Sequence, residues 1–256
     1  MWDAKTEIHQ KSTFYDLENW KQGKTSLQQF ELDALGDVAG KSLLHLQCHF
    51  GQDTLSWARM GAKVTGVDLS EKAIQLARQL NQELNLDVRF VQSNVLELDQ
   101  QLADQYDIVF TSYGTIGWLP DLNQWARIIH HFLKPGGIFY IVEFHPFIYM
   151  YDWDTLELTY PYFNVGRPFE DEEEGTYANR EANIKLKEYF WQHSIADTLQ
   201  PLLRQGLQLI DFQEFSESPY RCFSNMNTLD NGHFYFGKRE LLLPHLFSVK
   251  MKKGDE

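Results

Sequence analysis

Apolar runs alternate with helix-type patterns along the first part of the chain. Ser42–Leu46 and Lys63–Val67 are apolar almost throughout, and each precedes a segment with apolar residues at helical spacing. Strands of this kind are typical of a parallel sheet that helices cover on both faces. The opening stretch therefore predicts a βαβ unit, with a tight turn over Gln47–Gly51 and a helix over Asp53–Met60.

Three further apolar runs extend this pattern. They predict strands over Asp87–Gln92, Tyr106–Ser112 and Ile138–Phe144. Leu122–Leu133 predicts a helix that stops before Pro135, because proline and the two glycines after it cannot continue a helix. Five strands with helices between them predict a doubly wound α/β sheet.

The regular pattern breaks between residues 145 and 190, where many aromatic residues, two prolines and the acidic run Glu170–Glu174 show no period. We interpret this segment as an insertion at the strand ends, where open α/β sheets bind ligands, and the acidic run as solvated surface. A helix over Ser194–Gln205 and strands over Leu207–Phe215 and Leu241–Lys250 then complete the chain.

These parts predict a single domain. Its segments are an N-terminal helical cap (1–40), a ligand-binding core (41–146), an aromatic-rich insertion or lid (147–190), and the last helix with the closing strands (191–256). Within the cap, Leu27–Leu35 has apolar residues at helical spacing. The aromatic residues before it, among them Tyr15 and Trp20, either pack on the domain or form a lid over the ligand.

Composition narrows the classes of function. The 256 residues include 23 Lys and Arg against 36 Asp and Glu, a net charge of −13, which would repel a nucleic acid. The N-terminus has no signal-peptide pattern, and no apolar run approaches the roughly 18 residues of a membrane span. The two cysteines, Cys48 and Cys222, suggest neither a disulfide framework nor a metal pair. We expect a cytoplasmic protein without a bound metal, and the oligomeric state, including a homodimer, stays open.

The turn Gln47–Gly51 stands where dinucleotide-binding enzymes carry three glycines. Only Gly51 is present, and Asp53 places a carboxylate at the helix start, so a ligand with an ammonium group and no phosphate would fit better. Asp68, at the end of the second strand, can bind both ribose hydroxyls of an adenosine, or it is an acidic residue favoured by the helix dipole. Asn94 can read an adenine edge or simply form a turn.

These residues resemble the class I S-adenosylmethionine-dependent methyltransferases. The first motif of that family has the form acidic-Leu-Gly-Cys-Gly-x-Gly after a strand, and in that register this chain has His45-Leu46-Gln47-Cys48-His49-Phe50-Gly51. The likeness covers residues 41–146 and 192–250 and continues through Val67-Asp68, Ser93-Asn94-Val95, Asp107–Ser112 and Lys134-Pro135-Gly136-Gly137.

The resemblance implies a Rossmann-like, mostly parallel seven-stranded sheet whose last, antiparallel strand lies between the fifth and sixth. It also implies S-adenosylmethionine as cofactor and a small or medium organic molecule as methyl acceptor. The cofactor-binding positions of the family correspond here to Gln47, Cys48, His49, Gly51, Asp53, Asp68, Leu69, Asn94, Val95, Ser112 and Tyr113. His45 replaces the acidic residue, Gln47 and His49 replace two glycines, and Asp53 can supply the missing carboxylate.

Methyl transfer requires two aligned substrates and a site without water. A base would help a hydroxyl or protonated amine to react, and His145 and His193 are the candidates, although either can be a hydrogen-bonded structural histidine. Tyr113 and Trp118 follow the fourth strand and either face the sulfonium or pack as part of a lid. The predicted substrate and lid residues are Tyr15, Trp20, Trp118, Tyr149 and Tyr151.

The sequence does not exclude three other functions. An aminopropyl transferase would also use acidic residues, but with a decarboxylated cofactor. A dehydrogenase would need the missing glycines, and a non-catalytic binding module would account for the altered first motif. Binding of S-adenosylmethionine, with NAD as the control, separates these functions.

Overall fold

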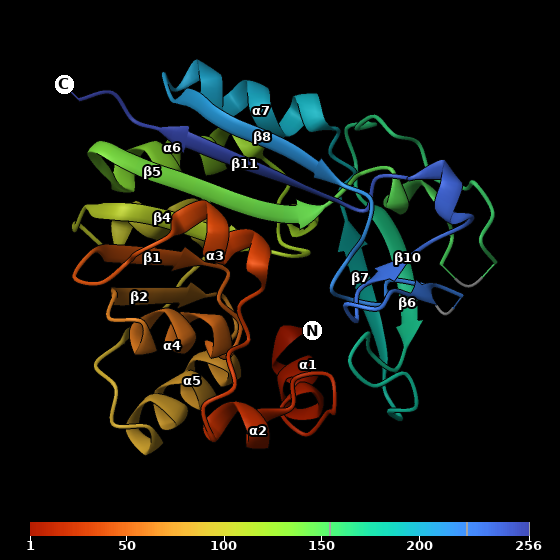
Figure 1. Ribbon diagram of the computed structural model, residues 1–256, viewed down its shortest axis with the longest axis horizontal. Helices are drawn as coiled ribbons and strands as arrows, with labels where there is room; N and C mark the ends of the chain where they lie inside the picture. The colour runs from red at the N-terminus through yellow and green to blue at the C-terminus, as the bar shows by residue number, and fades with distance from the viewer. Residues whose placement is uncertain (154, 224, 256) are drawn as a thin grey trace.

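The computed structural model describes residues 1–153, 155–223 and 225–255, without the side chain of Glu173. Its centre is a seven-stranded sheet of order β3-β2-β1-β4-β5-β11-β8 (Figure 1). β11 runs antiparallel to both of its neighbours, which confirms the predicted strand order. The strands are β1 (Ser42–Leu46), β2 (Lys63–Asp68), β3 (Arg89–Gln92), β4 (Tyr106–Ser112), β5 (Leu133–Phe144), β8 (Gln208–Phe215) and β11 (Leu246–Lys252).

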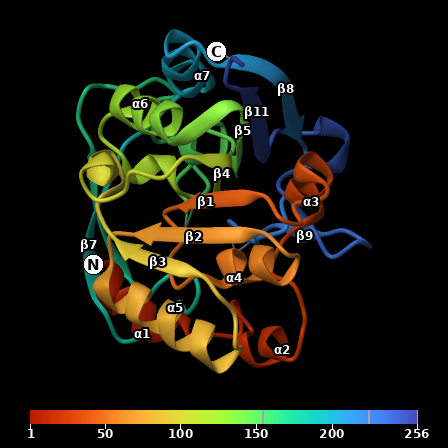
Figure 2. The same ribbon diagram turned by 90° about the vertical axis from the view of Figure 1, so that its left-hand side faces the viewer.

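Helices cover both faces of the sheet (Figure 2). Trp57 and Leu80 belong to the apolar cluster of one face, and Trp125 and Leu202 belong to that of the other. The strands are therefore buried on both sides, as their apolar runs predict. One face carries α3 (Gln29–Leu35), α4 (Gln52–Arg59) and α5 (Glu71–Glu83), and the other carries η1 (Val95–Gln100), α6 (Leu122–Phe132) and α7 (Ile195–Arg204).

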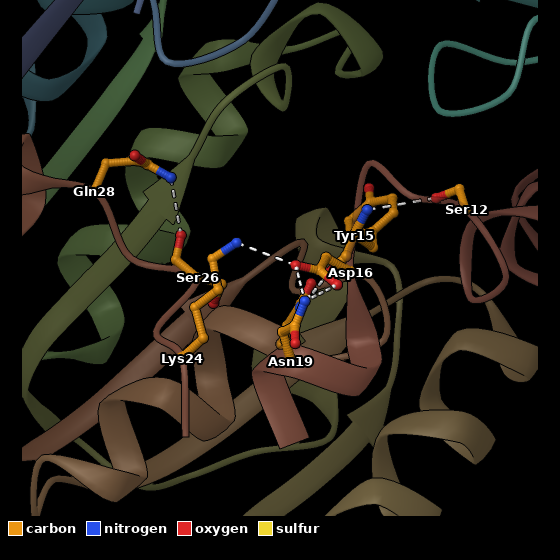
Figure 3. A network of polar contacts seen from close by, with 8 residues as sticks. Ser12, Tyr15, Asp16, Asn19, Lys24, Ser26 and Gln28 are labelled. Carbon is orange, nitrogen blue, oxygen red and sulfur yellow. Dashed lines mark hydrogen bonds and ion pairs between the residues drawn. The ribbon is translucent and has the colours of Figure 1, made fainter. Parts of the chain in front are cut away.

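Two helices precede this core, α1 (Trp2–His9) and α2 (Leu17–Lys21). A polar network around Asp16 holds the start of α2: the Asp16 carboxylate accepts hydrogen bonds from Asn19 and from Lys24, as Figure 3 shows. The helical cap therefore contains α3, where the spacing predicts a helix, and also α1, which the spacing does not predict.

Trp20 does not lie over the ligand edge, so its prediction as a lid residue needs correction. Its ring is buried beside α4, where the indole nitrogen donates to Ser56 Oγ at 2.9 Å. The Arg59 guanidinium covers the ring at 4.5 Å from its centre. The aromatic side chain is needed to close the apolar cluster under α4, and Trp20 is a core residue.

The segment 145–190, which shows no regular period in the sequence, contains a hairpin that the sequence does not predict. β6 (Phe169–Glu174) pairs antiparallel with β7 (Lys185–Phe190). Ion pairs join the strands, Lys185 with Glu172 at 2.8 Å and Lys187 with Glu170 at 2.5 Å. The facing residues are largely charged, and the hydrophobic pattern therefore does not reveal this hairpin. Short helical turns lie before it, η2 (Ile116–Trp118) and η3 (Ile148–Met150).

The last strand begins at Leu246, whereas the sequence predicts a start at Leu241. Arg239–Leu241 forms the turn η4, and Leu242 has a left-handed backbone with φ of 46°. β11 pairs on both sides, and Pro244 cannot donate a hydrogen bond to such a central strand. The loop before η4 holds a small ladder of β9 (Asn227–Thr228) and β10 (Phe234–Tyr235). Among the described residues, the helices are all too short or too polar to cross a membrane.

Candidate functional site

The turn after β1 keeps the backbone shape of a glycine-rich turn. Gln47 has φ of 55° and His49 has φ of 50°, both in the left-handed region that favours glycine. Gly51, with φ of 77°, precedes α4. A left-handed backbone costs a non-glycine residue on the order of 1–2 kcal/mol. Strain at two positions of one turn is typical of a functional site.

Asp68 ends β2 beside this turn. Its Oδ2 accepts the His49 N–H at 2.8 Å, and its Oδ1 accepts the Ser70 N–H at 2.9 Å. Burial raises the pKa of Asp68, and these backbone hydrogen bonds oppose the rise. Each carboxylate oxygen retains a second lone pair, with which it can accept a hydrogen bond from a ligand hydroxyl.

Three buried polar atoms at this edge have no hydrogen-bond partner within the described ranges: Gln47 Oε1, His49 Nδ1 and His9 Nε2. The Gln47 Nε2 donates to the Thr115 carbonyl at 2.9 Å, so the amide oxygen is the open atom. His49 Nε2 lies 2.8 Å from His9 Nδ1. Buried polar groups are nearly always paired, and a group of open ones indicates a ligand site.

His9 is the residue of this site that sequence reasoning missed. It lies on α1, 40 residues before His49, and its side chain is fully buried at 0% exposure. The ring stacks on Tyr15 at 5.4 Å and meets Tyr177 at 4.6 Å. Burial lowers the pKa of His9 to about 2 and that of His49 to about 3, so both rings are neutral near pH 7. A single histidine in a polar N-terminal segment carries no motif or period that could have indicated this position.

Two buried carboxyl groups lie near the turn. Burial raises the pKa of Asp53 to about 6 and that of Glu31 to about 8, and the charge of Asp53 adds to the second shift. The Tyr113 hydroxyl donates to Glu31 at 2.8 Å, while Ser26 and Ser112 hydrogen-bond Asp53. No ion pair within the described chain joins either carboxyl group to a basic side chain. Near pH 7 Asp53 is therefore mostly ionised and Glu31 mostly protonated, and the Asp53 carboxylate favours a cationic ligand.

The other predicted cofactor residues line the same edge of the sheet. The Cys48 N–H donates to the β2 backbone at 2.8 Å, and its side chain is buried. Leu69 is 61% exposed just after β2. The Asn94 side chain is exposed and caps η1, and Val95 behind it is buried. In the described part of the chain, no three His, Cys, Asp or Glu side chains converge to hold a metal ion.

α1 and the hairpin β6–β7 together form the cover of this edge (Figure 1). The Lys5 ammonium on α1 pairs with the Glu188 carboxylate on β7 at 2.5 Å. The hydroxyls of Tyr15 and Tyr177 lie 2.5 Å apart. The Trp118 ring meets the Trp2 ring edge-on at 5.1 Å. Two of the predicted lid residues, Tyr15 and Trp118, therefore contact this cover.

A small apolar cavity of about 10 Å³ lies where β4 and β5 end under the hairpin. Ile116, Tyr149 and Phe190 are among its lining residues. A volume of this size holds about one water molecule. Tyr151, predicted beside Tyr149, packs on Phe236 at 5.5 Å in an apolar cluster that Tyr149 also contacts.

The two histidines predicted as bases have both ring nitrogens engaged. His145 Nε2 lies 2.8 Å from Glu214 Oε1, and its Nδ1 accepts a backbone N–H at 3.1 Å. His193 Nε2 lies 2.8 Å from the Leu119 carbonyl, and its Nδ1 is 3.3 Å from an asparagine amide. Burial lowers the pKa of both rings. Their catalytic role stays a prediction, and in this geometry neither has an open nitrogen.

Glu143, the buried carboxylate near the end of β5, orders the loop after β4. It accepts the backbone N–H of Gly114, of Thr115 at 2.7 Å and of Ile116 at 3.2 Å. The carbonyl of the same Thr115 accepts a hydrogen bond from the Gln47 side-chain amide. Glu143 therefore sets, through this loop, the direction in which the Gln47 oxygen points.

Comparison with known proteins adds independent information. Residues 43–137 match a family model described as a methyltransferase domain. The ubiquinone biosynthesis O-methyltransferase of Acinetobacter baylyi is 32% identical over 169 residues, which are 62% of this chain and 69% of that protein. The enzyme of the same name from Bordetella avium is 36% identical over 102 residues, 40% of this chain and 42% of that protein.

A solved structure shares the fold. It is a putative S-adenosylmethionine-dependent methyltransferase from Listeria monocytogenes, with a TM-score of 0.57 and 20% identity over 88% of this chain and 96% of that one. The open acceptor at Gln47, the neutral histidines and the Asp68 carboxylate suit a cofactor that carries ammonium and hydroxyl donors. Motif, fold and relatives agree, and the chain belongs to the class I S-adenosylmethionine-dependent methyltransferases.

Proposed function

We propose that this chain methylates a hydroxyl group on a small organic acceptor. The observation that carries the proposal is the turn after β1, where Gln47 and His49 keep left-handed backbones and open polar atoms beside Asp68. Oxygen is favoured as the acceptor atom because the curated relatives are named as O-methyltransferases. The chain spans 69% of one of these relatives and 42% of the other.

Different residues at the sheet edge bind different parts of the cofactor. When bound, S-adenosylmethionine supplies an electrophilic methyl group. Asp68 accepts hydrogen bonds from the ribose hydroxyls, and the Gln47 oxygen and Asp53 accept hydrogen bonds from the ammonium group. Leu69 and Val95 supply apolar surface for the adenine, and Asn94 supplies an amide for its edge. Cys48, His49, Gly51, Ser112 and Tyr113 complete the contact surface.

The acceptor site lies between the ends of β4 and β5 and the hairpin. Ile116, Tyr149 and Phe190 give that region an apolar and aromatic wall. Such walls suit a flat organic molecule and exclude water from the transfer. The chain then acts chiefly by holding the two reactants in line.

Methylation of an amine is the second candidate. The Glu31 carboxyl group favours it, because burial raises its pKa to about 8 and the group can therefore exchange a proton with an amine near neutral pH. Turnover of benzylamine in preference to catechol would support this candidate over the hydroxyl acceptor.

Titration calorimetry with S-adenosylmethionine and S-adenosylhomocysteine, with NAD as the control, tests the cofactor. We expect micromolar binding of the first two and none of NAD. Asp68→Asn should weaken S-adenosylhomocysteine by about 10–100-fold, since it removes charge-assisted hydrogen bonds worth roughly 1.5–3 kcal/mol. Asp104→Asn, at an exposed ion pair, is the matched control. Absence of binding by the parent protein would overturn the proposal.

A further inference from the structure

The rings of His9 and His49 together carry two N–H protons, and the contact between the rings restricts where these protons can lie. Both rings are neutral, so each carries one N–H and one bare nitrogen. The contact of 2.8 Å between His9 Nδ1 and His49 Nε2 uses one proton of the two. The second proton must therefore lie on one of the two outer atoms, His9 Nε2 or His49 Nδ1.

The tautomers of the two rings are coupled for this reason. If His9 donates through Nδ1, its Nε2 is bare and His49 must carry its proton on Nδ1. If His49 donates through Nε2, its Nδ1 is bare and His9 carries its proton on Nε2. In both cases the pair offers one donor and one acceptor at its outer ends, and a ligand that fixes one end fixes the other.

Both outer ends are closed off from water. His9 is fully buried, and the outer nitrogens of both rings have no partner in the described chain. The rings of Trp2 and Tyr15 contact His49 at 5.9 and 5.6 Å. A donor and an acceptor that are buried together in this way need a ligand with complementary groups.

We propose that His9 is a cofactor-binding residue and that the His9–His49 pair contacts S-adenosylmethionine through its two outer nitrogens. This inference rests on the proposed function. The pair joins α1 to the turn after β1, so half of the contact belongs to the N-terminal helix. The cofactor offers hydroxyl and ammonium donors as well as carboxylate and ring acceptors, and these complement one donor and one acceptor.

Affinity for S-adenosylhomocysteine tests the proposal on the full chain. His9→Asn keeps an amide near the Nδ1 position but has no atom at Nε2, and we expect about 10-fold weaker binding, the scale of one lost hydrogen bond. His9→Gln places an amide near Nε2 and should recover part of the loss. His131→Asn, exposed at the end of α6, is the matched control. Equal affinities of the parent and both His9 variants would overturn the proposal.

Histidine tautomers in the unmodified protein give a second readout that needs no variant. Nitrogen NMR of protein labelled with ¹⁵N-histidine should show His9 and His49 in the same neutral tautomer. Saturating S-adenosylhomocysteine should shift both rings together toward one tautomer. Unchanged resonances of both rings at saturation would overturn the proposal. Failure of the parent protein to bind S-adenosylhomocysteine would instead remove the proposed function itself.

Discussion

At the scale of residues, this site uses side chains where its family uses glycine. Gln47 and His49 adopt backbone angles that glycine reaches without strain, and each retains an open polar atom. The strain costs on the order of 1–2 kcal/mol for each residue. Hydrogen bonds to a ligand can offset this strain, and we therefore expect Gln47 and His49 to change the way the cofactor is held without removing the site.

Glu31 gives a prediction about pH. Its pKa is about 8 in the folded protein against an ordinary value of 4.5, so the folded chain binds this proton more tightly than the unfolded chain does. Its contribution to the free energy of unfolding therefore falls as pH rises from about 5 through 8. Relative to Glu31→Gln, the parent should lose roughly 2 kcal/mol between pH 6 and 8. Urea unfolding at several pH values measures this, and parallel pH profiles of the two proteins would contradict it.

Glu143 gives a prediction about stability. Glu143→Gln replaces an acceptor oxygen by an NH₂ group that faces backbone N–H donors at the loop after β4. We expect a loss of about 2–3 kcal/mol in the free energy of unfolding, because buried donors lose their partner. Denaturant unfolding measures it, with Glu181→Gln, at an exposed position, as the control. A loss no larger than that of the control would show that Glu143 does not order this loop.

At the scale of elements, the sequence predicts what apolar periodicity encodes. The bounds of β1 and β4 match their predicted strands, because both strands are buried runs between clear breaks. The hairpin β6–β7 was missed because charges pair its strands. α1 was missed because its buried residues are Lys5, Thr6 and His9, which are polar and show no apolar stripe.

The contact between α1 and the hairpin gives a prediction at this scale. Lys5 is 1% exposed and pairs with Glu188. Lys5→Met should lower the free energy of unfolding by about 3 kcal/mol, because it removes the ammonium group that pairs with the buried Glu188 carboxylate. The double variant with Glu188→Leu should recover at least half of that loss in denaturant unfolding.

Lys185→Met supplies the matched control for that cycle. Its ion pair with Glu172 joins two side chains that are more than half exposed, so the change should cost less than about 1 kcal/mol. Equal losses from Lys5→Met and Lys185→Met would show that the pair on α1 contributes no more than a surface ion pair.

At the scale of the whole molecule, the site joins three parts that are distant in the sequence. The sheet edge could be predicted, because the ends of parallel strands converge by topology. The positions of α1 and the hairpin over that edge could not, because they depend on single contacts such as His9 with His49 and Tyr15 with Tyr177. This is why the sequence predicts most of the cofactor edge but, of the residues at its cover, only Tyr15 and Trp118.

We expect the cover to move when ligands enter. The cavity beneath the hairpin measures about 10 Å³, whereas sites for small molecules and cofactors measure roughly 300–1,000 Å³. Without ligand, hydrogen–deuterium exchange should therefore be faster in α1 and β7 than in β1 and β4. Saturating S-adenosylhomocysteine should slow α1 and β7 together by at least about 10-fold, since Lys5 and Glu188 join them, and leave the sheet unchanged. If the ligand slowed exchange in α1 alone, the hairpin would be a separate lid for the acceptor. If, without ligand, α1 and β7 were already as protected from exchange as β4, a moving cover would be ruled out.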